Sequence, residues 1–405
     1  MTKKSDVPAI RFKGFSDAWE QRKLGELALF NPKDELPQTF EYVDLESVVG
    51  TEMLSHRTEV KSSAPSRAQR LAHTGDLFYQ TVRPYQKNNY LFEKPDNNYV
   101  FSTGYAQMRP YVDGYFLLSL LQSERFVKVV LDNCTGTSYP AINANDLAEI
   151  EVAAPSDESE AQRIGTIFRS IDNLITLHQR KFEKLTNVKK SMLEKMFPQN
   201  GSSYPEIRFK GFTDPWEQRK LGEMGQTYTG LSGKTKDDFG HGQARFVTYM
   251  NVFSNPISNP EMTEPIEIDP KQNEVEVGDV FFTTSSETPE EVGMSSILLE
   301  KRGKTYLNSF CFGFRPSEKI DSYYLAYMLR SESTRAKIIL LAQGISRYNI
   351  SKNKVMEIAV SLPSLDEQKM IGQYFSQLDN LITLHQRELE KLQNIKKSML
   401  EKMFV

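Results

Sequence analysis

Two long segments of the chain, 157–198 and 364–405, have the hydrophobic pattern of a coiled-coil helix. Apolar or small residues recur in both at alternating intervals of three and four, a spacing that places them along one face of a helix. Pro198 ends the first segment, because proline cannot continue a helix. We therefore predict two helices, each about 40 residues and roughly 60 Å long.

Each predicted helix begins with a capping-box pattern. Asp157 precedes Glu160, and Ser364 precedes Glu367, with the spacing at which the two side chains satisfy each other's backbone N–H groups. We expect these glutamates to cap their own helices.

A helix this long with one apolar seam needs a partner, and the chain contains two such helices. We predict that they pack against each other as an antiparallel intramolecular coiled coil. The middles of such a pair meet, so His178 and His385 should lie close together, as polar seam residues that set the register. The side chains expected to pack are Phe168, Ile171, Ile175, His178, Phe182, Leu185, Phe375, Leu378, Ile382, His385, Leu389 and Leu392.

The chain is also an internal repeat. Residues 8–27 return at 205–224 with four differences in twenty positions, and 171–197 return at 378–404 with five differences in twenty-seven. Between these near-identical segments the two halves diverge. A constant frame around two variable inserts suggests that frame and inserts have different tasks.

These patterns predict an α+β protein. Two pseudo-symmetric globular α/β domains, 1–156 and 199–363, would be separated by spacer helices 157–198 and 364–405.

Composition excludes several classes of protein. With 50 Lys and Arg against 53 Asp and Glu, the formal net charge is −3, so any nucleic-acid-binding face must be local. Cys134 and Cys311 match no disulfide or zinc-ligand spacing. No secretory signal and no apolar run of membrane-spanning length is present. We expect a cytoplasmic protein with no membrane partner.

No segment of the sequence matches a complete catalytic motif. The segment TGLSGKTK at 229–236 ends like a phosphate-binding loop, but Tyr228 stands where the first glycine is required. The Asn-Pro pairs at Asn31, Asn255 and Asn259 lack the second proline and the aromatic residue that adenine methyltransferases use. The five histidines form no metal-ligand pattern. We expect no active site, cofactor or metal in this chain.

Binding residues are easier to find, and they concentrate in the inserts. From Arg57 to Lys87 the first insert has six basic and two acidic residues, with polar and aromatic residues between them. Arginine can bind guanine, asparagine and glutamine can bind adenine, and threonine can contact the thymine methyl group. The stretch 261–291 of the second insert has ten acids and one base, so its DNA-binding face must lie elsewhere. The candidate DNA-binding residues are Arg67, Arg70, Thr81, Arg83, Tyr85, Gln86, Lys87, Asn88 and Tyr139 in the first half, and Lys234, Thr284, Ser285, Ser286, Arg347, Tyr348 and Lys352 in the second.

Over essentially its whole length, the chain resembles the specificity subunit of a Type I restriction-modification system. The resemblance rests on the repeated WEQRKLGE segment, the Gly-Asp-hydrophobic strands at Gly75 and Gly278, the LPSLDEQKMIG sequence at 362–372, and PSRAQRLAHTGDLFYQTVRPY in the first insert. Their duplicated order is more specific than any one of them.

The resemblance implies a subunit without an active site, whose two target-recognition domains each read one half of a split double-stranded DNA site in the major groove. The helices would set the gap between the half-sites and dock two modification subunits, which carry S-adenosylmethionine and methylate adenine. Restriction subunits would add ATP- and Mg²⁺-dependent translocation and cleavage. The alternative is a structural adaptor with two protein-binding modules on a coiled-coil spacer, against which the Arg/Asn/Gln/Thr-rich first insert argues.

Overall fold

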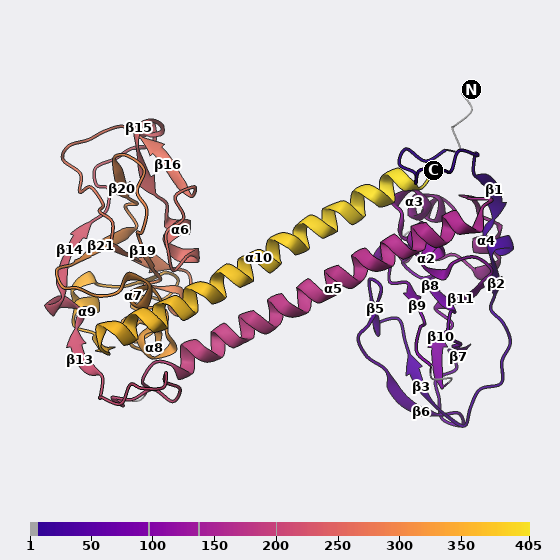
Figure 1. The fold of residues 1–405 in the computed structure, drawn as a ribbon, viewed down its shortest axis with the longest axis horizontal. Coiled ribbons are helices and arrows are strands. Elements are labelled where there is room, and N and C mark those ends of the chain that lie inside the picture. The colour runs from indigo at the N-terminus through magenta and orange to yellow at the C-terminus, as the bar shows by residue number, and fades with distance from the viewer. Residues whose placement is uncertain (1–6, 96–97, 137, 200) are drawn as a thin grey trace. The chain divides into compact units, whose positions relative to one another are not determined.

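The computed structural model describes residues 7–95, 98–136, 138–199 and 201–405. The chain divides into two compact units (Figure 1). Unit 1 comprises Met1–Gln179 with Gln386–Val405, and unit 2 comprises Arg180–His385. Each unit therefore contains one globular domain and parts of both long helices.

The described part of unit 1 is built on two four-stranded sheets. The first has the order β2 (Ala28–Phe30), β11 (Tyr105–Pro110), β8 (Leu77–Gln80), β9 (Tyr90–Leu91), and the second β6 (Arg57–Val60), β3 (Thr39–Val43), β10 (Tyr99–Ser102), β7 (Ala68–Leu71). Strand β10 runs parallel to β3, and the other pairs are antiparallel. Two small sheets join β4 (Val48–Val49) to β5 (Glu52–Met53) and β1 (Glu20–Lys23) to β12 (Glu151–Ala154). The short helices are α1 (Leu24–Leu27), η1 (Pro84–Gln86), α2 (Gly114–Gln122), α3 (Glu124–Asp132) and α4 (Ala144–Glu149).

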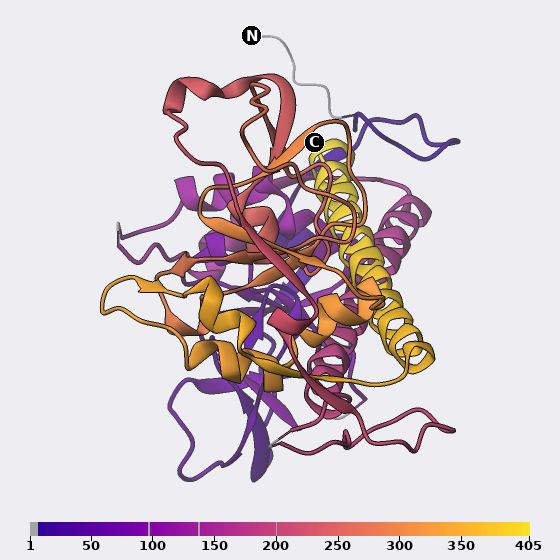
Figure 2. The same ribbon diagram turned by 90° about the vertical axis from the view of Figure 1, so that its left-hand side faces the viewer.

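Unit 2 repeats this plan (Figure 2). Its sheets have the orders β14 (Gly225–Thr229), β21 (Cys311–Pro316), β17 (Val280–Thr283), β19 (Ser295–Ile297) and β16 (Thr263–Ile266), β15 (Phe239–Val247), β20 (Thr305–Leu307). The parallel pair β15–β20 matches β3–β10. Small sheets join β13 (Glu217–Lys220) to β23 (Ala359–Leu362) and β18 (Ser285–Ser286) to β22 (Tyr348–Asn349). The short helices are η2 (Leu221–Glu223), η3 (Lys236–Asp238), α6 (Tyr249–Ser254), η4 (Pro289–Glu291), α7 (Ser322–Met328), α8 (Glu332–Ile339) and α9 (Lys352–Met356).

The repeated frame ties the start of each half to its long helix. The Arg11 guanidinium donates to both carboxylate oxygens of Glu160, at 2.5 and 2.7 Å, and Trp19 Nε1 donates to the same carboxylate at 3.2 Å. Arg208 makes the equivalent bidentate pair with Glu367, at 2.7 and 2.8 Å. The predicted helix starts are correct, since Asp157 Oδ1 accepts from Ser159 N–H at 2.8 Å and Ser364 Oγ accepts from Glu367 N–H at 3.4 Å. The expectation that the two glutamate side chains complete the capping boxes is wrong. Each carboxylate binds an arginine about 150 residues away in the sequence instead, which satisfies a buried charge more fully than one backbone N–H would.

The long helices are α5 (Glu158–Lys195) and α10 (Leu365–Met403). In unit 1, Phe168 of α5 packs on Phe404, with ring centroids 5.8 Å apart, and Asp172 pairs with Lys396 of α10 at 2.6 Å. As the α5 residue number rises, that of its α10 partner falls, so the helices are antiparallel.

Unit 2 gives the same direction for the helix pair. The Phe197 and Phe375 rings lie 5.9 Å apart, and Lys189 pairs with Asp379 at 2.5 Å. The predicted fold class, with two pseudo-symmetric domains and an antiparallel helix pair, is confirmed.

Burial along the helix seam changes between its ends and its middle. Phe168, Phe375 and Leu378 are buried in the cores of their units, and Ile171 is also buried. The remaining predicted seam residues are half-buried, namely Ile175, His178, Phe182, Leu185, Ile382, His385, Leu389 and Leu392. His178 and His385 belong to different units, so their approach to each other stays a prediction. Among the described helices, none combines the length and hydropathy required to cross a bilayer.

Candidate nucleic-acid interface

Most of the predicted binding residues of the first half lie in one loop, residues 81–89, which follows strand β8. The loop is closed at its base, where the Gln80 N–H donates to Asn89 Oδ1 at 2.9 Å. Arg83 and Lys87, which flank η1, both have left-handed backbone, with φ of 55° and 56°. Residues other than glycine rarely adopt this conformation, and such strain concentrates at ligand-binding sites.

A second loop of unit 1, residues 135–141, packs against the first. It is closed by two backbone hydrogen bonds between Thr135 and Ala141, of 2.9 and 3.0 Å. The Arg83 N–H donates to Pro140 O at 2.8 Å, and the Arg83 guanidinium lies over the Tyr139 ring, 4.4 Å from its centroid. The Tyr139 side chain is 63% exposed. Two residues predicted from distant segments therefore meet as an accessible cation–ring pair.

Arg67 and Arg70 lie on the edge of the same region. The Arg67 carbonyl accepts from Thr103 N–H at 2.8 Å, and the adjacent Gly104 carbonyl accepts from Thr81 N–H at 3.0 Å. Arg67 is exposed, whereas Arg70 is half-buried and burial lowers the pKa of its guanidinium. Of these two arginines, Arg67 is the more accessible.

The other residues of the first loop divide into outward-facing and internally bonded groups. Tyr85 is exposed, and Gln86 belongs to both groups, because its side chain is exposed while its Oε1 accepts from Gln80 Nε2 at 2.8 Å. The Thr81 hydroxyl is buried and donates to Gly104 O at 2.8 Å. The Lys87 ammonium donates to Glu124 at 2.7 Å, and Asn88 Oδ1 accepts from Gly50 N–H at 2.8 Å. In this conformation the accessible set is Arg67, Arg83, Tyr85, Gln86 and Tyr139.

Unit 2 brings its predicted residues together in the same way. Ser285 and Ser286, which follow strand β17, pair with Asn349 and Tyr348 as strands β18 and β22. The loop 343–349 is closed by two backbone hydrogen bonds between Gln343 and Asn349, of 3.0 and 2.8 Å.

A cation–ring pair also lies at this loop. The Arg347 guanidinium lies 5.9 Å from the centroid of the Phe310 ring, and the N–H and Oγ1 of Thr284 both donate to Phe310 O at 2.9 Å. Phe310 is 54% exposed and was not predicted as a binding residue. Its position as an aromatic residue in a polar turn between two strands is the sequence feature that could have indicated a binding role.

The closed loops of the two units correspond residue by residue. Gly136 and Gly344 open them with positive φ, and Tyr139 and Arg347 follow at the same position, three residues later. Tyr139 supplies the ring and takes its cation from Arg83, whereas Arg347 supplies the cation and takes its ring from Phe310. Each unit therefore presents a cation–ring pair from the same loop position, with the roles exchanged.

Other predicted residues of unit 2 are less available. The Lys234 ammonium pairs with Asp269 at 2.9 Å and with Asp238 at 3.5 Å. The hydrogen bond to Asp269 raises the pKa of Lys234, so its charge is retained but locally balanced. Ser285 and Ser286 are buried. Tyr348 is half-buried, as is Lys352, which makes no ion pair with another described residue.

In each unit an ion pair between a buried acid and a partly exposed arginine lies at the start of the strand that leads into the loop, and this pair was not predicted. Asp76, the acid of the Gly-Asp-hydrophobic strand, pairs with Arg109 at 2.8 Å, and Asp279 pairs with Arg315 at 2.8 Å. Both acids are 1% exposed at the side chain. Because each joins the start of β8 or β17 to the neighbouring strand, these pairs hold the strands from which the loops emerge.

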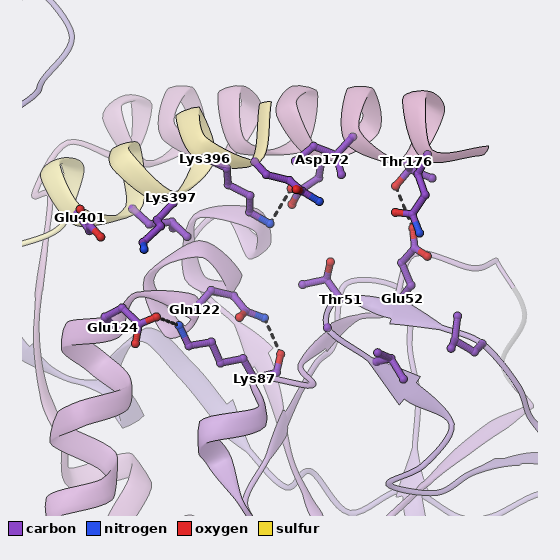
Figure 3. Close-up of a pocket in the computed structure, with 17 residues that line it drawn as sticks. Thr51, Glu52, Lys87, Gln122, Glu124, Asp172, Thr176, Lys396, Lys397 and Glu401 are labelled. Atoms are coloured by element: carbon purple, nitrogen blue, oxygen red, sulfur yellow. Dashed lines mark hydrogen bonds and ion pairs between the residues drawn. The ribbon is translucent and has the colours of Figure 1, made fainter. Parts of the chain in front are cut away.

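A cleft of about 560 Å³ opens in unit 1 between the β4–β5 hairpin, helix α2 and the two long helices (Figure 3). Its charged side chains are largely paired, as in Lys87–Glu124 and Asp172–Lys396. On the side of the cleft formed by the β4–β5 hairpin, Thr176 Oγ1 of α5 donates to the Glu52 carboxylate at 2.9 Å. Within the described ranges, no group of three or more His, Cys, Asp or Glu side chains is placed to hold a metal ion.

Comparison with known proteins decides the family. The family model for the Type I restriction modification DNA specificity domain matches residues 17–187 and again 213–394. The chain belongs to this family. Each match spans one globular domain and most of one long helix, which agrees with the internal repeat.

A curated relative agrees with this family assignment, and solved structures share the fold. The Type I restriction enzyme MjaVIII specificity subunit of Methanocaldococcus jannaschii is 25% identical over 304 residues, which cover 71% of this chain and 68% of that protein. The fold is similar to a Type I restriction-modification S subunit from M. genitalium, with a TM-score of 0.59, 15% identity, and 98% and 99% of the two chains covered. A chain from a study of complex assembly and conformational transition in the type I R-M system gives a TM-score of 0.51 at 21% identity, covering 94% of this chain and 96% of that one.

Proposed function

We propose that this chain is the non-catalytic specificity subunit of a Type I restriction-modification complex and that each globular domain reads one half of a bipartite site in double-stranded DNA. The observation that carries this proposal is the pair of matching closed loops, each with an exposed cation–ring contact. An arginine on a ring keeps its outer N–H donors free for guanine or phosphate, while the ring restricts its rotamers.

The reading surface differs between the two units, so the half-sites should differ in sequence. Unit 1 presents Arg83 on the Tyr139 ring together with the exposed residues Arg67, Tyr85 and Gln86, a set rich in groups that bond base edges. Unit 2 presents Arg347 beside Phe310, with many acids in the same insert. A near-neutral chain supplies few phosphate contacts, so partner subunits would supply much of the salt-dependent affinity.

The helix pair would set the spacing of the half-sites and dock two modification subunits. Its supporting observation is a set of exposed apolar side chains on both helices that lie outside the predicted seam. Leu174 and Leu177 of α5 are 44% and 45% exposed, and Leu381 and Leu384 of α10 are 44% and 51% exposed. Exposed leucines on pseudo-equivalent positions suit two copies of the same partner. S-adenosylmethionine, ATP and Mg²⁺ would then be bound by the modification and restriction subunits.

The test is a mobility shift of the purified chain on a randomised duplex, with and without its modification subunit, followed by sequencing of the bound pool. We expect two short specified sequences separated by a fixed unspecified gap, with tighter binding when the modification subunit is present. If the bound pool has no sequence preference under either condition, and the purified chain captures proteins but no DNA, the adaptor function is favoured instead.

A further inference from the structure

One buried amide supports most of the recognition loop of unit 1. Gln80, the last residue of β8, is 2% exposed. Its Nε2 donates to Val82 O at 2.6 Å and to Gln86 Oε1 at 2.8 Å, while its backbone N–H donates to the buried Asn89 side chain. Gln80 therefore contacts the beginning, the middle and the end of loop 81–89.

The loop that Gln80 supports is strained. Among described residues other than glycine, positive φ occurs at Asn31, Arg83 and Lys87, and two of these three lie in this loop. Left-handed backbone persists only where surrounding contacts hold it. Gln80 holds Val82, the neighbour of Arg83, and the Gln86 side chain, and is itself too deeply buried to contact a duplex.

The equivalent position in unit 2 closes its loop by different chemistry. Aligning GDLFYQ at 75–80 with GDVFFT at 278–283 places Thr283 opposite Gln80. Thr283 is fully buried. Its N–H donates to Met294 O at 2.9 Å, and its Oγ1 accepts from Met294 N–H at 3.0 Å. The strand-end side chain therefore ties down the base of loop 284–293. That loop in turn holds the Arg347–Phe310 pair, because Thr284 bonds to Phe310 O and Ser286 pairs with Tyr348, next to Arg347.

We propose that Gln80 and Thr283 are specificity-positioning residues. Each fixes the shape of the loop that follows it, and through that shape the base preference of one half-site, without contacting DNA. This inference rests on the proposed function.

The test uses two volume-conserving variants of the full chain, each assembled with its modification subunit. Gln80→Met keeps the length of the side chain but removes both Nε2 donors, and Thr283→Val keeps the shape but removes the hydroxyl. For Gln80→Met, we expect the preference for the favoured base to fall about tenfold at one or more positions of the first half-site, the amount that one base contact supplies. The second half-site should be unchanged. Thr283→Val should give the reverse.

Three further readouts separate positioning from general stability. Affinity for non-specific duplex and its salt dependence should stay within twofold of wild type, because the phosphate contacts remain. A melting curve shows whether each variant is folded. If a folded variant loses base preference equally in both half-sites, or keeps the preference in both, the positioning role is wrong. Should one variant unfold, the other tests the same role in its own half-site. If the wild-type complex itself selects no sequence, the proposed function fails instead.

Discussion

The C-terminal end of α10 completes the core of unit 1, so removing Phe404 should destabilise a domain that is far away in sequence. Phe404 is 5% exposed, and its ring centroid lies 6.2 Å from Trp19, 5.8 Å from Phe116 and 5.8 Å from Phe168. Truncating a buried phenylalanine to alanine costs about 3–5 kcal/mol. At about 2–4 °C per kcal/mol for a unit of this size, the melting transition of unit 1 should fall by roughly 10 °C.

The assay is thermal unfolding combined with amide hydrogen exchange, which assigns each transition to a unit. Phe404→Ala should accelerate exchange in β8 and α2 of unit 1 and leave the β17 region of unit 2 protected. Phe197→Ala is the matched variant, because Phe197 packs on Trp216, Tyr324 and Phe375 in unit 2, and it should have the opposite effect. Equal loss of protection in both units after Phe404→Ala, or a change below about 0.5 kcal/mol, would refute this description of the cores.

Three other changes have defined outcomes. Gly165→Ala would place a Cβ against Asp113 Oδ1, which caps α2. The free energy of unfolding of unit 1, measured in denaturant, should fall by about 1–3 kcal/mol. An unchanged free energy would show that α5 can move away from α2 at no cost. Four residues inserted after Thr186, about one helical turn, should change the gap in the selected DNA while leaving each half-site intact; an unchanged gap with normal affinity would mean that the helices do not set the spacing. Leu384→Asp should weaken binding of the modification subunit at least tenfold with an unchanged melting curve, measured by titration calorimetry, and unchanged binding would move the docking surface elsewhere.

Periodic patterns in the sequence predicted the parts of the fold that depend on local spacing. The heptad seam gave both long helices, and the near-identical segments gave the pseudo-symmetry that β3–β10 and β15–β20 display. The same local reasoning failed for Glu160. Its spacing from Asp157 fits a capping box, but the tertiary contact with Arg11 provides a bidentate ion pair in a buried place, and no local pattern contains that information.

The candidate site was predictable by residue type but not by geometry. Arg83, Tyr139 and Arg347 were found because their chemistry suits DNA, and the structure then placed two of them in one contact. Phe310 and Gln80 were missed for opposite reasons. An exposed aromatic in a turn has no spacing signal, and a buried glutamine at a strand end gains its role only when the loop folds back onto it.

The division into units also lay beyond the sequence. Boundaries at the helix starts follow from composition and capping signals, whereas Met403 and Phe404 belong to the core of unit 1 and Met196 and Phe197 to that of unit 2. Antiparallel pairing, which the sequence predicted, brings the end of each long helix to the globular domain of the other half, but no spacing in the sequence indicates which core residues those ends contact.

The central claim is that each domain reads one half of a divided DNA site. It is tested most directly by sequencing the bound pools of Arg83→Ala and Arg347→Ala complexes beside the wild type. We predict that Arg83→Ala relaxes base preference in one half-site only, that Arg347→Ala relaxes it in the other only, and that the gap stays fixed. A uniform loss of affinity across all sequences with a shallower salt dependence would make these arginines phosphate contacts, and a change in the same half-site for both variants would contradict the claim.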